Sequence, residues 1–319
     1  MPNSNSGPSK ANNPGLQSIE PTLRDYILLI MAMFFWGGSW VTGKIISDFA
    51  APLTMAFWRF AFASMFLLPA LWLTSNRSLS FDKKDIPSFF FLGLTGVAIY
   101  NYLFLTGLRY TTASSGALIA GTNPILIAIF AVLFLGEPRG SHKALGFLCG
   151  MIGVTFVIGV DALEGTNWQG NILIFLGMIA WASYSTRIKQ LSSHYTSWEL
   201  TTYGVICGTI ILFPLALLEW RPEIYEPEYL HIWGGILYLG LFATCGGFGL
   251  FNRSLKRIGA SRTAIFINLV PIFGSILAIL LLGENLTLLK VVGLMLVIGG
   301  VLIITQFDGT KKGEQLLPQ

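Results

Sequence analysis

Residues 124–137 read PILIAIFAVLFLGE, and residues 271–284 read PIFGSILAILLLGE. Both stretches begin with a proline and end in Gly-Glu, and eight of their fourteen positions are identical at an offset of 147 residues. This offset holds without a gap from about residue 102 to residue 160, while the earlier parts of the two halves match more weakly at an offset of 145. One unit therefore occurs twice in this chain.

The composition indicates an integral membrane protein. Of the 319 residues, 53% are hydrophobic and 11% are charged, whereas a soluble domain carries about 25% charged residues. Ten apolar runs can be marked, each near the length that crosses the hydrocarbon core as a helix, and none alternates in polarity as a barrel strand would. The predicted spans are 26–47, 52–74, 87–107, 112–135, 142–160, 170–190, 196–218, 231–252, 260–282 and 286–306.

The positive charges predict the orientation of the chain. With the N-terminus inside, cytoplasmic segments hold fifteen of the 20 Lys and Arg residues and outer loops hold three. We therefore expect a multi-pass protein of the cytoplasmic (inner) membrane with both termini in the cytoplasm. Residues 1–25 lack the apolar core of a signal peptide and are predicted to be a disordered cytoplasmic tail, and residues 307–319 are predicted to be a second cytoplasmic tail.

The repeats are predicted to face opposite ways across the membrane. Residues 26–160 form the first repeat and residues 170–306 the second, with five spans each. Because five is odd, the two repeats are inverted about an axis in the membrane plane. The predicted fold is an all-α membrane protein of ten transmembrane helices. Such inverted repeats suit alternating access, with the binding site at the repeat interface near the bilayer midplane.

The doubled arrangement resembles the EamA domains of the drug/metabolite transporter superfamily. The resemblance covers the chain from about Tyr26 to Thr305 and depends on FFWGGSWVTGK at 34–44, WRF at 58–60 and the paired P…GE stretches. It implies a small-solute carrier, commonly an exporter of amino acids or other metabolites, with spans five and ten at the periphery. The matched positions Gly37-Gly38 and Ala182-Ser183 differ, so the two gates need not behave identically.

Arg59 is the charged residue that the sequence places inside the second span. A buried arginine in a span is costly and usually faces a cavity or a partner. Its planar guanidinium suits a carboxylate or a phosphate of a solute. The alternative is a structural pair or a side chain that reaches outward to the membrane surface.

Aromatic and amide side chains are the other candidates for the wall of a central cavity. They lie deeper than the interfacial belts in which such aromatic residues usually occur, and packing inside the bundle is the alternative role for each. Trp36 and Trp181 also occupy matched positions in the two repeats. The candidate residues for solute binding are Trp36, Arg59, Tyr100, Asn101, Asn123, Trp181, Tyr184 and Asn268.

Pro124 and Pro271 open the duplicated stretch and are candidate hinges. We expect each to remove one backbone hydrogen bond within a span. The alternative is a packing kink. Glu137 and Glu284 close the stretch, and we expect structural roles for them, as partners of helix ends or of Lys143 and Lys290.

The predicted function is secondary transport of a small organic solute, amphipathic or anionic, by alternating access. Neither an ATP-binding domain nor an acidic residue clearly at mid-membrane is present, Glu199 being the nearest candidate, which favours facilitated export or exchange over proton coupling. The alternatives are a membrane-embedded enzyme and a pore, but no recognisable catalytic motif is present. Cys149, Cys207 and Cys245 are scattered, as are the three histidines.

We therefore expect no catalytic residue, no metal site and no cofactor. The expected partners are the solute and the lipid bilayer. No basic block suggests nucleic acid, and the sequence does not indicate an oligomeric state.

Overall fold

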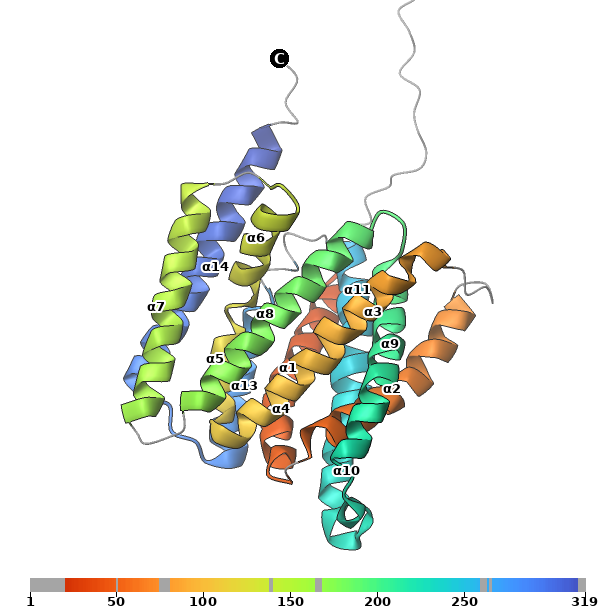
Figure 1. Cartoon of the computed structure of the whole chain (residues 1–319). Helices are drawn as coiled ribbons and strands as arrows, with labels where there is room; N and C mark the ends of the chain where they lie inside the picture. Colours follow the sequence, from red (N-terminus) through yellow and green to blue (C-terminus); the bar gives the residue numbers. More distant parts are fainter. Residues whose placement is uncertain are drawn as a thin grey trace, which may run out of the picture.

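The computed structural model describes residues 21–49, 51–74, 81–137, 140–163, 168–258, 263 and 266–314, and within these residues the chain is helical, without a strand (Figure 1). The first repeat contains α1 (Leu23–Ser47), α2 (Pro52–Thr74), η1 (Lys83–Asp85), α3 (Ile86–Leu92), η2 (Gly93–Ile99), α4 (Tyr100–Tyr110), α5 (Ala113–Ala120), α6 (Asn123–Phe134) and α7 (Ser141–Leu163). The second contains α8 (Trp168–Leu191), α9 (Ser197–Leu218), η3 (Pro222–Tyr225), η4 (Pro227–Tyr229), α10 (Leu230–Leu237), η5 (Tyr238–Gly246), α11 (Gly247–Ile258), α13 (Leu269–Leu282) and α14 (Leu288–Glu314).

The helices agree with an all-α membrane protein built from two five-helix repeats. Within the described residues, seven helical segments are long and apolar enough to cross a membrane. Helix α8 falls short because polar residues occupy its first turn as well as its last two turns, while α13 spans 14 residues and the apolar part of α14 ends at Ile304. Helix α1 begins and α14 ends at the same end of the bundle (Figure 1), which an even number of spans requires.

The two predicted tails differ in part from the observed helices. Residues 1–20 and 315–319 lie outside the described residues. Helix α1 already begins at Leu23, where Thr22 and Asp25 form a capping box, and α14 continues to Glu314. The ends of the apolar runs therefore did not mark the ends of the helices, because capped or polar turns extend them.

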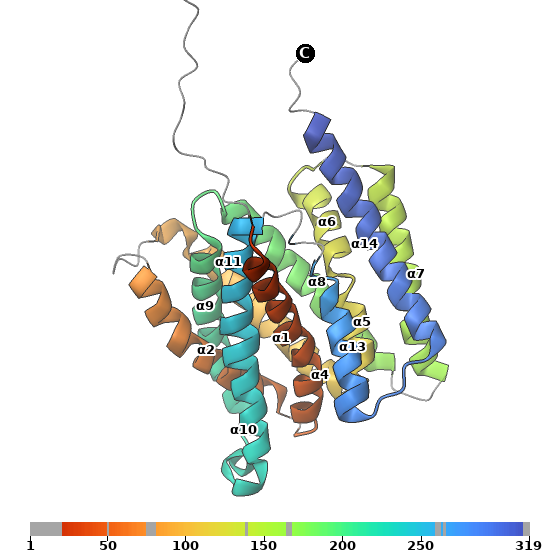
Figure 2. The same ribbon diagram turned by 180° about the vertical axis from the view of Figure 1, so that it is seen from behind.

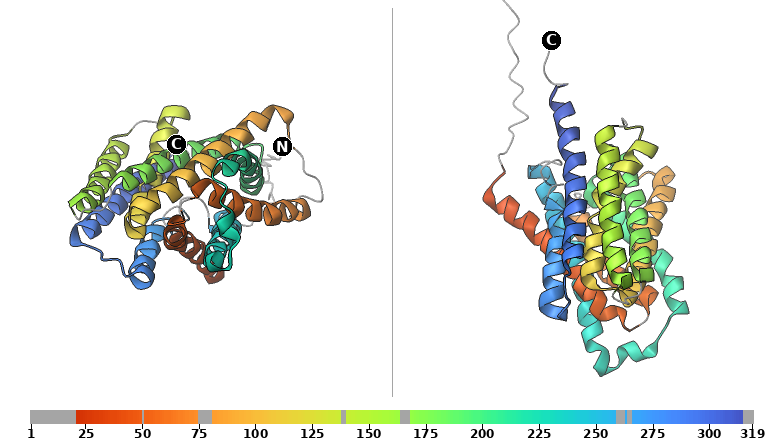
Figure 3. Two further views of the ribbon diagram at one scale, coloured as in Figure 1. Left: turned by 60° about the horizontal axis from the view of Figure 1, so that its bottom comes forward. Right: turned by 90° about the vertical axis from the view of Figure 1, so that its left-hand side faces the viewer.

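Contacts between helices follow the inverted repeat. The equivalent helices α2 and α9 pack together at one edge of the bundle, and the equivalent helices α7 and α14 pack together at the opposite edge (Figures 1 and 3). Helix α1 packs against η5, α11 and α13 of the second repeat, and α8 packs against η2, α4 and α6 of the first. Each repeat thus places its first helix within the other repeat, as Figure 2 shows for α1 beside α11 and α13.

The third and eighth spans each contain a π-helix at an equivalent position. At an offset of 147, η2 of the first repeat corresponds to η5 of the second. A Cβ atom at Gly93 would lie 2.4 Å from the backbone nitrogen of Gly208 in α9, and one at the equivalent Gly240 would lie 2.7 Å from the carbonyl oxygen of Arg59 in α2. Both wide turns therefore press directly on the backbone of the helix pair α2–α9.

The duplicated stretch ends each time in the same helix cap. Gly136 and Gly283 both have a φ of 66°, in the left-handed region that glycine tolerates. The next residues, Glu137 and Glu284, donate their backbone N–H groups to the carbonyls of Ala131 and Ala278, at 3.2 and 3.3 Å. Each helix thus ends with a glycine in the left-handed conformation, the αL type of C-cap, which explains why Gly-Glu closes both copies.

The prolines of the stretch lie in first turns of helices rather than within continuous spans. The fourth span breaks between α5 and α6, and Pro124 follows at the start of α6. Pro271 occupies the third position of α13, directly after a turn at residues 267–268. The N–H groups of a first turn have no intrahelical partner. The expectation that each proline removes a bond from a continuous helix is therefore corrected.

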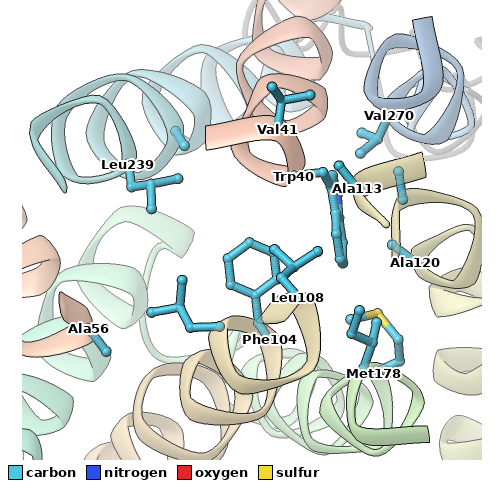
Figure 4. Packing of buried hydrophobic residues seen from close by; sticks show 14 of the residues in the cluster. Trp40, Val41, Ala56, Phe104, Leu108, Ala113, Ala120, Met178, Leu239 and Val270 are labelled. Atoms are coloured by element: carbon cyan, nitrogen blue, oxygen red, sulfur yellow. The ribbon is translucent and has the colours of Figure 1, made fainter. Parts of the chain in front are cut away.

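The buried core contains a ring pair in the second half of α1, where this helix packs against α4 of the same repeat. Trp40 packs edge-on against Phe104 of α4, with 4.9 Å between ring centroids (Figure 4). Gly43 and Gly116 let these rings approach, since a Cβ atom would lie 2.7 Å from Phe104 at the first position and 2.8 Å from Trp40 at the second. Leu108 packs in the same cluster, so α1 and α4 are tightly sealed here.

Candidate solute-binding site

Arg59 lies buried in α2, with 8% of its surface exposed. Its Nη1 donates to Asn101 Oδ1 at 2.7 Å, and its Nε and Nη2 both approach Thr244 Oγ1 at 3.3 Å. The guanidinium also lies 4.9 Å from the ring centroid of Phe60. Among the described residues, no carboxylate lies within ion-pair distance of Arg59. A buried cation is thus held by neutral groups alone.

The two π-helices supply these neutral partners, one from each repeat. Asn101 follows η2 and donates through Nδ2 to the carbonyls of Val97 at 2.8 Å and Gly96 at 3.4 Å. Thr244 lies in η5 and donates to the carbonyl of Leu239 at 2.8 Å. In both cases a side chain satisfies a carbonyl of the widened turn. The hydrogen bonds that Asn101 and Thr244 donate to backbone carbonyls therefore hold their acceptor oxygens in place against Arg59.

An aromatic cluster connects the matched tryptophans across the repeat interface. Phe248 of α11 lies 5.4 Å from Trp36 and 6.0 Å from Trp181 between ring centroids. Trp181 continues to Tyr100 at 5.0 Å and to Tyr184 at 4.9 Å. We call these five residues the interface aromatic cluster.

Hydrogen bonding and close packing fix both ends of the interface aromatic cluster. Trp36 Nε1 donates to the carbonyl of Ala243 in η5 at 2.9 Å. A Cβ atom at Gly96 in η2 would lie 2.3 Å from the Tyr184 ring. The π-helices thus contact both the arginine and the aromatic cluster, and they join the two parts into one site.

Six of the eight predicted residues lie in this neighbourhood. Arg59 contacts Asn101 directly, and Trp36, Tyr100, Trp181 and Tyr184 belong to the interface aromatic cluster. Asn123 begins α6 and Asn268 is the N-cap residue of α13, so both lie apart from Arg59, at the breaks of the fourth and ninth spans.

Those two breaks lie close to each other. A Cβ atom at Gly121 would be 3.5 Å from Pro271. The Oδ1 atom of Asn123 is buried there and has no hydrogen-bond partner among the described residues, and Asn268 is buried with 7% exposure. The breaks thus form a second polar position of the interface, separate from Arg59.

Sequence reasoning did not identify Thr244 and Phe248. Thr244 stands in a run of small and apolar residues, and nothing in the sequence marks the π-helix that aims it at Arg59. Phe248 offered one signal, because it is the equivalent of Asn101 at the offset of 147. That equivalence places both residues directly after a π-helix.

The acidic residues considered from the sequence are engaged at helix ends. Glu199 accepts hydrogen bonds from the N–H and hydroxyl of Thr196 in a capping box. Glu284 accepts from the backbone N–H groups of Ala113 and Ser114, at 2.7 and 2.9 Å, and so caps α5. The expected role of Glu284 at a helix end is confirmed.

Glu137, the equivalent of Glu284 in the first repeat, forms ion pairs with lysines, which is the other structural role expected from the sequence. The carboxylate bonds Lys143 Nζ at 3.1 Å and also Lys189 of α8. Burial by itself would raise the pKa of Glu137, but the hydrogen bonds from Lys189 and Lys143 outweigh it and lower the pKa below the usual value of 4.5. Glu137 thus fastens the loop after α6 to the end of α8.

Comparison with known proteins gives a consistent result. The model of the EamA-like transporter family matches residues 23–159 and 168–306. The chain is 32% identical to the uncharacterized transporter YyaM of Bacillus subtilis, over 88% of this chain and 93% of that protein. It is 28% identical to an uncharacterized transporter of Archaeoglobus fulgidus, over 89% and 99% of the two chains. A solved crystal structure at 18% identity covers 90% of this chain and 98% of its own, with a TM-score of 0.61, and shows the fold alone.

Proposed function

Because the chain belongs to the EamA-like transporter family, we propose that this membrane transporter exports a small organic solute with an anionic group, an amino acid or another metabolite, by alternating access. The proposal depends mainly on one observation. Arg59 is buried at the interface of the two repeats and is held by neutral groups, one from each repeat.

The charge of Arg59 supports an anionic solute. Burying a cation without a paired anion is unfavourable, and among the described residues the neutral acceptors of Asn101 and Thr244 and the ring of Phe60 offset that cost. A carboxylate or phosphate that displaces the weak bonds to Thr244, both 3.3 Å long, would gain a charge-assisted fork. Asn101 would then keep the guanidinium oriented from the other side.

The interface aromatic cluster supports a solute that also has an apolar part. Trp36, Trp181 and Tyr184 are partly or largely buried beside the π-helices and present ring faces and edges near the arginine site. Binding pockets for small molecules are mainly apolar and carry a few polar groups that fix orientation. The combination favours an amphipathic organic anion over an inorganic one.

The symmetry of the site supports alternating access. Equivalent π-helices from opposed repeats hold the two sides of Arg59, so a movement of either repeat changes its surroundings. The breaks before Pro124 and Pro271 are matched in the same way, and we assign them as the hinges of the two gates. Because Glu199 serves as a cap, facilitated export or exchange remains the proposed mode rather than proton coupling.

The test begins with a comparison of excreted metabolites between cells with and without the protein. Solutes that differ are then offered to purified protein in liposomes, where a carrier gives saturable flux without chemical change. Chemical conversion of the solute would indicate a membrane enzyme, and single-channel currents would indicate a pore. Either result would refute the proposal.

Arg59 variants test the assigned site with the solute found. Arg59→Gln keeps a donor for Asn101 but removes the charge, so flux at sub-saturating solute should fall about 10- to 100-fold. Arg59→Lys should recover only part of it, because the planar fork is lost. Arg24→Gln removes an exposed charge from the start of α1 and serves as the matched control. Normal flux in correctly folded Arg59→Gln would return Arg59 to a structural role.

A further inference from the structure

A groove of about 400 Å³ lies between α3, α6 and α8, away from the site at Arg59. Helix α8 contacts both α3 and α6 (Figure 1), so the groove follows the seam between the third, fourth and sixth spans. Its lining includes Ser88, Phe91, Phe130, Phe134, Arg187 and Gln190. We call this cavity the α3–α6–α8 groove.

The polar end of the groove carries positive charge and hydrogen-bond donors. Arg187 Nη2 donates to Ser88 Oγ at 2.6 Å, and Nη1 donates to Gln190 Oε1 at 2.7 Å. These two bonds leave other N–H donors of the guanidinium available, and the Ser88 hydroxyl, which accepts from Arg187, retains its proton as a donor. Among the described residues that line the groove, Arg187 is charged and none is acidic.

The opposite wall is apolar and faces outward from the bundle. Phe134 is 62% exposed and Phe91 is 42% exposed, and the neighbouring Leu133 is 61% exposed. Phe130 packs on Phe134 with 5.3 Å between ring centroids. Exposed rings on spanning helices contact acyl chains in a bilayer. The groove therefore joins a cationic end to a wall that lies among lipid tails.

We propose that the α3–α6–α8 groove binds an anionic phospholipid, with the phosphate at Arg187 and Ser88 and an acyl chain along the three phenylalanines. Ser88 stands two residues after the start of α3, and Arg187 four residues before the end of α8, so both lie at the depth of a headgroup. Basic pockets between spanning helices on the cytoplasmic side commonly hold anionic headgroups. In the expected orientation of the chain, this lipid would come from the cytoplasmic leaflet. Its binding does not depend on which solute the protein transports.

The nearby carboxylate does not oppose this assignment. Glu137 is already paired with Lys189 and Lys143, so its charge is compensated within the protein. A lipid phosphate at Arg187 would lie beside this network without meeting a free anion. The bound lipid would contact α3, α6 and α8 together, and these helices belong to both repeats.

Native mass spectrometry of the purified protein in a non-ionic detergent tests the proposal. With equal amounts of phosphatidylglycerol and phosphatidylcholine, the protein should retain phosphatidylglycerol preferentially. Arg187→Gln should weaken this binding about tenfold or more, since one charge-assisted contact is lost. Arg187→Lys should keep part of the affinity, and Ser88→Ala should reduce it several-fold. Arg24→Gln, an equal loss of charge on an exposed side chain of α1, should leave it unchanged.

Three results would overturn the assignment. They are equal retention of the two lipids, undiminished phosphatidylglycerol binding by folded Arg187→Gln, and displacement of the lipid by millimolar glycerol phosphate. The last result would mean that the headgroup alone is recognised and that a soluble ligand is the occupant. If Arg187→Gln does not fold, Ser88→Ala decides, because it removes a donor of the groove and keeps the arginine.

Discussion

The contact between α7 and α14 allows a sharp test of the packing, because two adjacent glycines of α14 differ in their surroundings. A Cβ atom at Gly300 would lie 2.5 Å from the carbonyl oxygen of Gly146, whereas one at Gly299 would meet nothing within 4 Å. A second contact of the same interface is similarly close, because a Cβ atom at Gly153 would lie 2.6 Å from the carbonyl oxygen of Gly293. Helix packing in membranes depends on such close backbone approach.

The expected cost of Gly300→Ala follows from the size of this clash. An ordinary contact begins at 3.4 Å, so the two helices must separate by about 0.9 Å near Gly146. The obstacle is backbone, which cannot rotate away, and overpacking of this kind costs about 1–3 kcal/mol. Gly299→Ala introduces no clash and replaces a helical glycine, so it should raise stability by up to about 1 kcal/mol.

The free energy of unfolding of both variants can be measured by titration from mild detergent into sodium dodecyl sulfate, followed by circular dichroism. The two values should differ by about 1–4 kcal/mol, the sum of the two effects. If Gly300→Ala is as stable as Gly299→Ala, the helices do not approach as described. Transport should be unchanged in Gly299→Ala, because α14 takes no part in the site around Arg59.

Three further predictions concern caps, pH and orientation. Glu284→Gln should lower the free energy of unfolding by about 1–2 kcal/mol, because the N-terminus of α5 loses an anionic cap. The control in the same thermal melts is Glu228→Gln, which changes an exposed carboxylate. Equal melting points of the two variants would exclude the capping role. The lowered pKa of Glu137 means that its ion pairs stabilise the fold above the usual value of 4.5, and this contribution is lost as pH falls through the lower folded value. The stability difference between the unmodified chain and Glu137→Gln should accordingly be present at neutral pH and vanish in acid, whereas a constant difference would contradict the assignment. With the native cysteines replaced, Glu228→Cys should react with an impermeant maleimide on intact cells and Lys83→Cys only after the membrane is opened; reaction of Lys83→Cys from outside would contradict the proposed orientation.

The fold was largely predictable because its main determinants are periodic or repeated in the sequence. The apolar runs located the spans, and the duplicated stretch at an offset of 147 established the two repeats. Even the matched Gly-Glu endings were visible, although their role as left-handed helix caps required the backbone angles of Gly136 and Gly283. Local signals of this kind can be read without knowing which helices become neighbours.

The site was predictable only in part, because its geometry depends on irregular backbone and on distant contacts. Arg59 stood out as a charge within a span, but a π-helix leaves no mark in an apolar sequence, so Thr244 was missed. The partner of Glu284 lies 170 positions earlier in the chain, at Ser114. The prolines lie at the two broken spans, but the sequence could not distinguish a kink within a helix from the start of a new one.

The exchange of α1 and α8 between the repeats has a consequence for synthesis of the chain. Trp36 of α1 precedes Pro271 of α13 by 235 residues, and α1 packs against α13 and α11 in the finished protein. At about 5–20 residues per second, ribosomes need roughly 10–50 s to make the intervening chain. During that time α1 can pack on α4 and α5 of its own repeat but lacks its contacts with α13 of the second. In an incompletely synthesised chain, membrane proteases should therefore recognise the exposed surface of α1 rather than the helix made last.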